Sequence, residues 1–262
     1  MLIARRLVLR RIAQAAAVCG AGALSTRSEA EPAATTRVPV HPQVAARYAA
    51  QWSAPKPVVV ARAHWETGHT PSGVPPARYA RAVKAVFIHH TDSGNDYQPS
   101  DVPAIIRNIY RDQTQRRGWD DIGYNFLVDK DGTIYEGRHG GIDEPVVGAH
   151  TSGFNIGTVG IAAIGTFTSG VAVPAAMLDA IARLTAWKLG RHGVDPRAMA
   201  TLTCTNTASR YHKGVRATVD VVSGHRDVDE TLCPGSALHA QLPRIRAEAA
   251  RLQGRAAAHR FG

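Results

Sequence analysis

Two widely separated segments carry side chains that could bind a metal ion. A short apolar run ends in His89-His90, and far along the chain Gly224-His225 is followed eight residues later by Cys233. Neutral imidazole and cysteine thiolate are preferred ligands of zinc. A structural zinc site normally uses four protein ligands, whereas three leave one position open for water or substrate. The sequence therefore predicts a catalytic zinc centre.

Each of these residues, taken alone, has a simpler structural explanation. A single histidine at the end of a strand is more often hydrogen-bonded within the fold, and a buried cysteine more often packs as a small apolar side chain. Cys204 and Cys233 could also pair with each other, because two cysteines in an exported protein usually form a disulfide. The place of Cys233 close behind His225 favours a metal ligand and leaves Cys204 as an unpaired thiol.

The ligands must be delivered by rigid backbone elements. Residues 83–88 form an apolar run that predicts a buried strand, and because side chains alternate along a strand, His89 and His90 must point to opposite faces. Only one of the two can reach the metal. A second predicted strand, residues 219–222, delivers His225. Ligands held at strand ends are well placed to form a preorganised site.

The rest of the chain alternates between strand and helix patterns. Further strands are expected at 124–128, at 133–135 after an Asp-Lys-Asp-Gly turn, and at 158–164. Helices are expected from Ser100 to a stop at Gly118, over residues 174–189, and from Ser236 onward. Regular βαβ alternation is absent. We therefore expect an α/β fold with a single domain over residues 57–252, in which helices flank a central mixed β-sheet.

The N-terminus has the layout of a secretory signal peptide. Arginines cluster within residues 1–11, a weakly apolar stretch covers residues 12–24, and Ser28 and Ala30 are small residues at the two cleavage subsites. The paired Arg5-Arg6 suits a twin-arginine signal. The stretch is too short to span a bilayer, so no stable membrane insertion is expected. We expect residues 31–56 to be a linker or N-terminal arm, and residues 253–262 a C-terminal tail.

Charge points to an anionic partner. The net charge of +10 falls to about +6 without residues 1–30, which hold five arginines and one glutamate. A moderate positive excess suits a cell-wall surface. No run of basic residues with interleaved aromatics is present, so nucleic acid is not an expected partner. Nothing in the sequence indicates an obligate oligomer, and we expect a monomer.

Several motifs together resemble the peptidoglycan recognition protein family, which belongs with the zinc-dependent N-acetylmuramoyl-L-alanine amidases (type 2 amidases). The matching segments, in the family's order, are Phe87–Thr91, Trp119–Phe126, Tyr135–Arg138, Gly148–His150, Gly224–Arg226 and Cys233–Gly235. The resemblance covers roughly residues 58–250. It implies a bacterial member that is secreted or associated with the cell wall, with peptidoglycan as its partner.

The resemblance also implies roles for individual residues. The family's three zinc ligands correspond to His89, His225 and Cys233, its active-site tyrosine to Tyr124, and its polar residue two positions before the cysteine to Thr231. The second histidine of the pair then faces into the fold. The implied reaction is hydrolysis of the amide between the lactyl group of N-acetylmuramic acid and L-alanine of the stem peptide. Members that only bind peptidoglycan commonly lack the cysteine, so its presence favours catalysis.

Three further residues are candidates for contact with the substrate, namely His150, Arg138 and Trp119. A guanidinium suits bidentate pairing with a stem-peptide carboxylate. Some relatives carry Gly-Trp where this chain has His139-Gly140, which leaves the choice between diaminopimelate and lysine stems open.

No general base can be assigned from the sequence, because an HExxH helix is absent and neither Glu136 nor Asp227 is placed at the metal by its motif. Two other functions fit the same motifs. The chain could be a non-catalytic peptidoglycan-binding module, or a zinc peptidase that cuts within the stem peptide.

Overall fold

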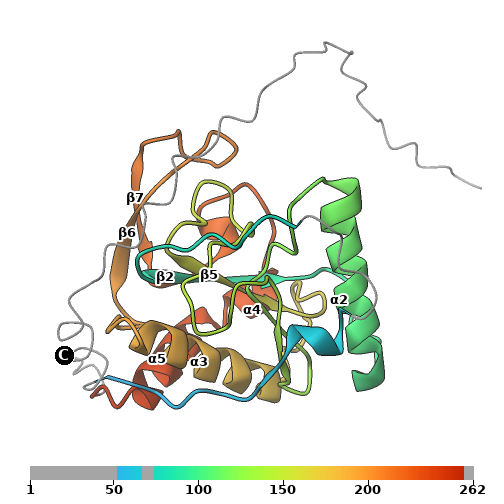
Figure 1. Cartoon of the computed structure of the whole chain (residues 1–262). Helices are drawn as coiled ribbons and strands as arrows, with labels where there is room; N and C mark the ends of the chain where they lie inside the picture. Colours follow the sequence, from blue (N-terminus) through green and yellow to red (C-terminus); the bar gives the residue numbers. More distant parts are fainter. Residues whose placement is uncertain (1–51, 67–73, 257–262) are drawn as a thin grey trace, which may run out of the picture. The chain divides into compact units, whose positions relative to one another are not determined.

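The computed structural model describes residues 52–66 and 74–256 (Figure 1). The predicted signal peptide, residues 31–51 of the predicted arm and residues 257–262 of the predicted tail lie outside these residues. The strands are β1 (Val59–Val60), β2 (Ala85–His90), β3 (Phe126–Val128), β4 (Ile134–Glu136), β5 (Thr158–Ala163), β6 (Met199–Thr203), β7 (Arg216–Asp220) and β8 (Val222–Gly224). The helices are α2 (Val102–Arg111), α3 (Ala175–Gly190), α4 (Ser236–His239) and α5 (Leu242–Leu252).

Shorter helical turns join these elements. They are the 3-10 turns η1 (Arg62–His64), η2 (Pro99–Asp101) and η4 (His225–Asp227), and the π-helical segment η3 (Asp112–Arg116) that extends α2. The extended helical segment stops at Gly118, as predicted, and this glycine has a φ of 69°.

Six strands form one mixed sheet in the order β1-β4-β3-β5-β2-β8. Strands β3 and β4 are antiparallel, while β2 is parallel to both of its neighbours, β5 and β8. The predicted central mixed sheet is therefore confirmed. Because β2 and β8 are adjacent and parallel, their carboxyl ends lie at the same edge of the sheet.

Helices cover both faces of this sheet. On one face α3 and α5 lie side by side (Figure 1), and Met177, Ile181 and Ile245 pack with Ile161 of β5 in the largest apolar cluster. Helix α3 is buried on most of its circumference, because it lies between the sheet and α5.

On the other face α2 buries a stripe of side chains at intervals of four residues, Val102, Ile106 and Tyr110. These residues pack with Leu127 of β3 and Ala162 of β5, whose neighbours in each strand belong to the opposite face. Alternation along the strands thus separates two cores. The observed architecture is the predicted single α/β domain with flanking helices.

Three features differ from the sequence-based expectation. The strand predicted at 219–222 is wrong as one unit, since β7 ends at Asp220 and β8 begins at Val222, where the chain passes from one sheet to the other. The helix predicted from Ser236 is interrupted after His239, and α5 restarts with a proline in its first turn. The antiparallel hairpin β6–β7 was not predicted at all.

Both ends of the described chain pack on the domain. Lys56, in the predicted arm, forms an ion pair with Asp143, and β1 pairs with β4. Gln253, in the predicted tail, is buried and donates to the carbonyl of Ala186. Within the described residues, every helix is too short or too polar to cross a membrane.

Candidate metal centre and cleft

The carboxyl ends of β2 and β8 bring the three predicted ligands together. His89 lies near the end of β2, and His225 is the first residue after β8. One donor atom from each of His89, His225 and Cys233 can be chosen so that all lie within 4.8 Å of one another. The Sγ atom of Cys233 is 3.7 Å from Nδ1 of His89, and the rings of His89 and His225 have centroids 4.7 Å apart.

The loop that carries Cys233 is anchored by its own backbone. The N–H of Arg226 donates to the carbonyl of Cys233, and the N–H of Cys233 donates to Oγ1 of Thr231. Gly235 has a φ of 85°, and a Cβ atom there would lie 2.1 Å from the carbonyl oxygen of Phe167. A glycine is therefore required at this position of the Cys-Pro-Gly motif, and it fixes how closely the loop approaches the neighbouring segment.

His89 and His90 point to opposite faces, as alternation predicts. The ring of His90 turns away from the cluster, and its Nδ1 accepts a hydrogen bond from the N–H of Phe167. Its backbone N–H instead donates to Sγ of Cys233 at 3.4 Å. Both cysteines are free thiols, and the Sγ of Cys204 donates to the carbonyl of Asn206. A disulfide between the two cysteines is thus absent.

The electrostatics of the cluster suit a divalent cation. Burial, followed by the neighbouring charge of His225, lowers the pKa of His89 well below its usual range, so its imidazole is neutral and able to act as a ligand. Burial raises the pKa of Cys233 to about 12, and a bound cation would favour the thiolate. Two imidazoles and a thiol form a donor set that suits zinc. The residues present therefore fit a zinc ion.

Each histidine of the cluster has a polar partner behind it. Nε2 of His89 lies 3.2 Å from Nδ1 of His150, which is also 3.0 Å from the hydroxyl of Thr151. Nε2 of His225 lies 2.9 Å from Oδ2 of Asp229. Asp229 was not predicted from the sequence. Its position four residues after a predicted ligand, in the same turn, was the available signal.

An open cleft of about 710 Å³ adjoins this cluster. Its lining residues come from four separate stretches of the chain and are mostly polar: Arg117, Trp119, Ala149, His150, Ser152, Asn155, Thr207, Ala208, Ser209, Arg210, His225, Asp229, Glu230 and Thr231. One wall belongs to the loop between β6 and β7, which, like its hairpin, was not predicted from the sequence. That loop is held by Ser209 and Arg210, whose side chains donate to backbone carbonyls of Val228 and Asp229.

Two side chains with hydroxyl groups lie beside the cluster. The ring of Tyr124 has its centroid 5.4 Å from that of His89. Burial, and then the nearby Cys233, raise the pKa of Tyr124, so its phenol stays protonated at neutral pH and can donate a hydrogen bond. Thr231 lines the cleft, and since its oxygen accepts from Cys233, its hydroxyl proton is directed to another acceptor.

The three candidates for substrate contact lie in different settings. Trp119 is 36% exposed and lines the cleft, and His150 lines it although it is buried. Arg138 is not among the residues that line the cleft. Its side chain donates to the carbonyl of Ile122 and lies 3.8 Å from Asp120.

The residue that departs from the family pattern faces away from this cleft. His139 places Nδ1 2.6 Å from Asp121 and Nε2 3.1 Å from the carbonyl of Pro75. The imidazole at this position is therefore engaged in the interior network and is not a cleft residue.

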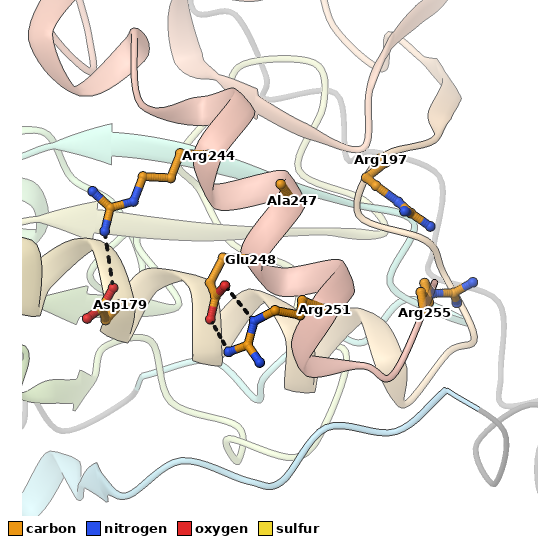
Figure 2. Close-up of a pocket in the computed structure, with 7 residues that line it drawn as sticks. All are labelled: Asp179, Arg197, Arg244, Ala247, Glu248, Arg251 and Arg255. Carbon is orange, nitrogen blue, oxygen red and sulfur yellow. Dashed lines mark hydrogen bonds and ion pairs between the residues drawn. The ribbon is translucent and has the colours of Figure 1, made fainter. Parts of the chain in front are cut away.

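A second cavity, of about 560 Å³, lies on the opposite helical layer between α3 and α5 and is unrelated to the ligand cluster (Figure 2). Its arginines are matched by carboxylates. Arg244 pairs with Asp179, and Arg251 pairs with Glu248. This is a solvated ion-pair surface, and the chemistry of the described residues is concentrated at the edge of the sheet.

Comparison with known proteins gives the same picture. Residues 79–236 match the family model described as N-acetylmuramoyl-L-alanine amidase. A short peptidoglycan-recognition protein of Drosophila melanogaster is 36% identical over 127 residues, which are 48% of this chain and 66% of the fly protein. Peptidoglycan recognition protein 1 of Bos indicus is 31% identical over 163 residues, which are 62% of this chain and 72% of the bovine protein.

Solved structures agree with the sequence matches. Peptidoglycan recognition protein LE, in complex with tracheal cytotoxin, superimposes with a TM-score of 0.55 and 28% identity over 71% of this chain and 92% of that one. The family match spans the β2 histidines, the cleft and the Cys-Pro-Gly loop. The chain therefore belongs to the family of the type 2 N-acetylmuramoyl-L-alanine amidases and peptidoglycan recognition proteins.

Proposed function

We propose that this protein is a zinc-dependent hydrolase that cleaves the amide between the lactyl group of N-acetylmuramic acid and L-alanine of peptidoglycan stem peptides. The observation that carries the proposal is the convergence of donor atoms from His89, His225 and Cys233 within 4.8 Å, beside an open cleft. Three ligands leave a position free for chemistry. A module that only binds peptidoglycan needs neither the cysteine nor its placement.

In this proposal the three ligands hold the ion at the edge of the sheet. Zinc bound there would supply Lewis acidity and lower the pKa of a bound water towards ~7. Tyr124 and Thr231 act as hydrogen-bond donors to the oxygen on which negative charge develops during attack on the amide. A preorganised donor of this kind is typically worth about 3 kcal/mol in the transition state. Tyr124 suits the role because its buried phenol stays protonated.

The cleft suits a peptide with polar and charged groups. Trp119 offers an exposed ring face, with the guanidinium of Arg117 5.7 Å from its centroid. His150 lies deeper, next to His89. We propose that Trp119 and His150 contact the stem peptide or muramic acid, and that Arg138 contributes its charge from beneath the cleft floor. A monomeric diaminopimelic acid-type peptidoglycan occupies the related protein LE, which makes such a stem the first substrate to test.

We also propose that the protein acts outside the cytoplasm. Residues 1–30 would serve as a twin-arginine-like signal peptide, residues 31–56 as an arm and residues 57–252 as the amidase domain. A mature N-terminus near residue 31 in protein recovered from the culture medium or cell wall would support this. Retention of Met1 in that fraction would contradict it.

Digestion of purified peptidoglycan tests the proposed reaction. The protein is loaded with zinc and incubated with the polymer, with and without a chelator, and the products are identified by mass spectrometry. An amidase releases stem peptides that begin with a free L-alanine, and the chelator stops the release. Products that keep the bond between muramic acid and alanine would identify a peptidase. Binding to the polymer without any product would identify a recognition module.

A further inference from the structure

The turn that follows β8 contains a carboxylate whose side chain serves one visible purpose. Asp229 is 8% exposed, and its Oδ2 lies 2.9 Å from Nε2 of His225. The other oxygen, Oδ1, is buried and has no hydrogen-bond partner among the described residues. A buried carboxylate that is only half satisfied is costly to the fold. Its presence at this position suggests a role beyond stability.

The geometry separates Asp229 from the ligands themselves. The group of donor atoms within 4.8 Å of one another contains His89, His225 and Cys233 but not Asp229. Asp229 is therefore behind His225 and not a fourth ligand. Because Nε2 of His225 is engaged by the carboxylate, Nδ1 is the nitrogen left for a metal. The hydrogen bond places the imidazole proton on Nε2 and keeps the lone pair of Nδ1 available.

The two ligand histidines are supported by partners of different charge. Nε2 of His89 meets a second imidazole, His150, whose pKa burial lowers to about 3, so this partner is neutral. His225 alone has an anionic partner. A carboxylate behind a ligand imidazole increases the electron density on the coordinating nitrogen and fixes the ring, whereas a neutral acceptor mainly fixes the ring.

We propose that Asp229 is the positioning residue of the zinc site, which orients His225 through Nε2 and strengthens its binding to the ion. The inference rests on the proposed zinc centre but is independent of the reaction catalysed there. It assigns a role to a residue outside the ligand set, and it makes the ligand at position 225 stronger than the ligand at position 89.

The test measures metal affinity directly. The dissociation constant for zinc is determined by competition with a chromophoric chelator for the full-length protein and for Asp229→Asn and Asp229→Ala. Cobalt replaces zinc in parallel, so that the thiolate-to-cobalt absorption band reports whether Cys233 still binds. We expect zinc affinity to fall about 10- to 100-fold in both variants, with the larger loss in Asp229→Ala. The thiolate band should persist at saturating cobalt.

A matched control separates positioning from damage to the turn. Asp227 lies in the same turn and pairs with a different histidine, with its Oδ1 2.8 Å from Nε2 of His239. Asp227→Asn should leave zinc affinity within about threefold of the parent, since a partner outside the ligand set is not expected to tune the metal. Thermal unfolding of each metal-free variant checks that the fold is retained.

Two outcomes would overturn the inference. Equal zinc affinity in Asp229→Asn and the parent would remove the positioning role while leaving the zinc hydrolase intact. A parent protein that binds cobalt without a thiolate band would overturn the zinc centre, and the inference with it. An equal loss in Asp227→Asn and Asp229→Asn would also count against it, because the effect would then belong to the turn.

Discussion

His89 and Cys233 are 144 residues apart in the chain, yet Nδ1 of the first lies 3.7 Å from Sγ of the second. The contact depends on the parallel pairing of β2 with β8 and on the anchored loop that follows. The site is thus a product of tertiary structure, and each of its parts can be removed separately.

Removal of the thiol should abolish metal binding. We expect Cys233→Ala to lose stoichiometric zinc and all amidase activity, because two imidazoles alone hold the ion far less tightly than three ligands. Metal content after dialysis, measured by atomic emission, checks this. Cys204→Ala is the control, since this thiol donates to a backbone carbonyl and lies outside the cluster. Full zinc occupancy in Cys233→Ala would contradict the ligand assignment.

Loss of the phenol should separate catalysis from binding. In Tyr124→Phe the ring beside His89 remains while the donor is lost. We expect kcat to fall by about 100-fold, the usual effect of removing one donor to a developing oxyanion, with KM and zinc content little changed. Steady-state kinetics on a soluble muramyl peptide measure both constants. An unchanged kcat would exclude Tyr124 from the mechanism.

The Cys-Pro-Gly loop should not tolerate a side chain at its glycine. Gly235→Ala places a Cβ 2.1 Å from the carbonyl oxygen of Phe167 and also strains a φ of 85°. We expect the free energy of unfolding to fall by about 2 kcal/mol or more, and zinc affinity to fall because Cys233 is displaced.

Gly254→Ala is the matched control, because its φ is 75° but no atom lies within 4 Å of the added Cβ. Chemical denaturation of both variants isolates the steric part of the effect. Equal destabilisation of the two would show that backbone strain alone is responsible.

Helix α3 carries a buried lysine whose charge should make stability depend on pH. Burial lowers the pKa of Lys188 to about 8 from its ordinary value of 10.5, with further contributions from Arg191 and Lys56 that are opposed by Asp143 and Glu144. Between these two values the unfolded chain binds more protons than the folded one. The contribution of Lys188 to the free energy of unfolding therefore increases as the pH rises from 8 to 10.5.

Lys188→Met removes this titration. The difference in unfolding free energy between the parent and Lys188→Met should shift in favour of the parent by up to about 3 kcal/mol from pH 8 to pH 10.5. Urea denaturation at the two pH values measures it. Lys84→Met, at an exposed lysine, should show no such shift. A constant difference for Lys188→Met would mean that the hydrogen bonds from Lys188 to two backbone carbonyls keep its ammonium as basic as in the unfolded chain.

The sequence predicted the elements whose pattern is local. The apolar run before His89 and the amphipathic stripe of Ile106 and Tyr110 each depend on residues close in the chain, and both elements formed where expected. Alternation also predicted correctly that His89 and His90 face opposite ways.

Features that depend on distant partners were not predictable in this way. The hairpin β6–β7 has exposed and buried residues that suit a small separate sheet, and only its packing against Phe87 and Phe154 identifies a core behind it. Asp229 was missed for the same reason. A carboxylate in a turn is ordinary in sequence, and its meaning comes from the 2.9 Å contact with His225.

The position of β2 between β5 and β8 also bears on biosynthesis. A nascent chain of about 200 residues already contains β5 and can form half of the central pairing, but it carries only His89 of the three proposed ligands. The last strand of the sheet and the remaining two ligands emerge together from the ribosome, within residues 222–233. A wall-degrading activity built in this order stays silent throughout most of translation, and truncated products released by premature termination before this point are harmless to the cell that makes them.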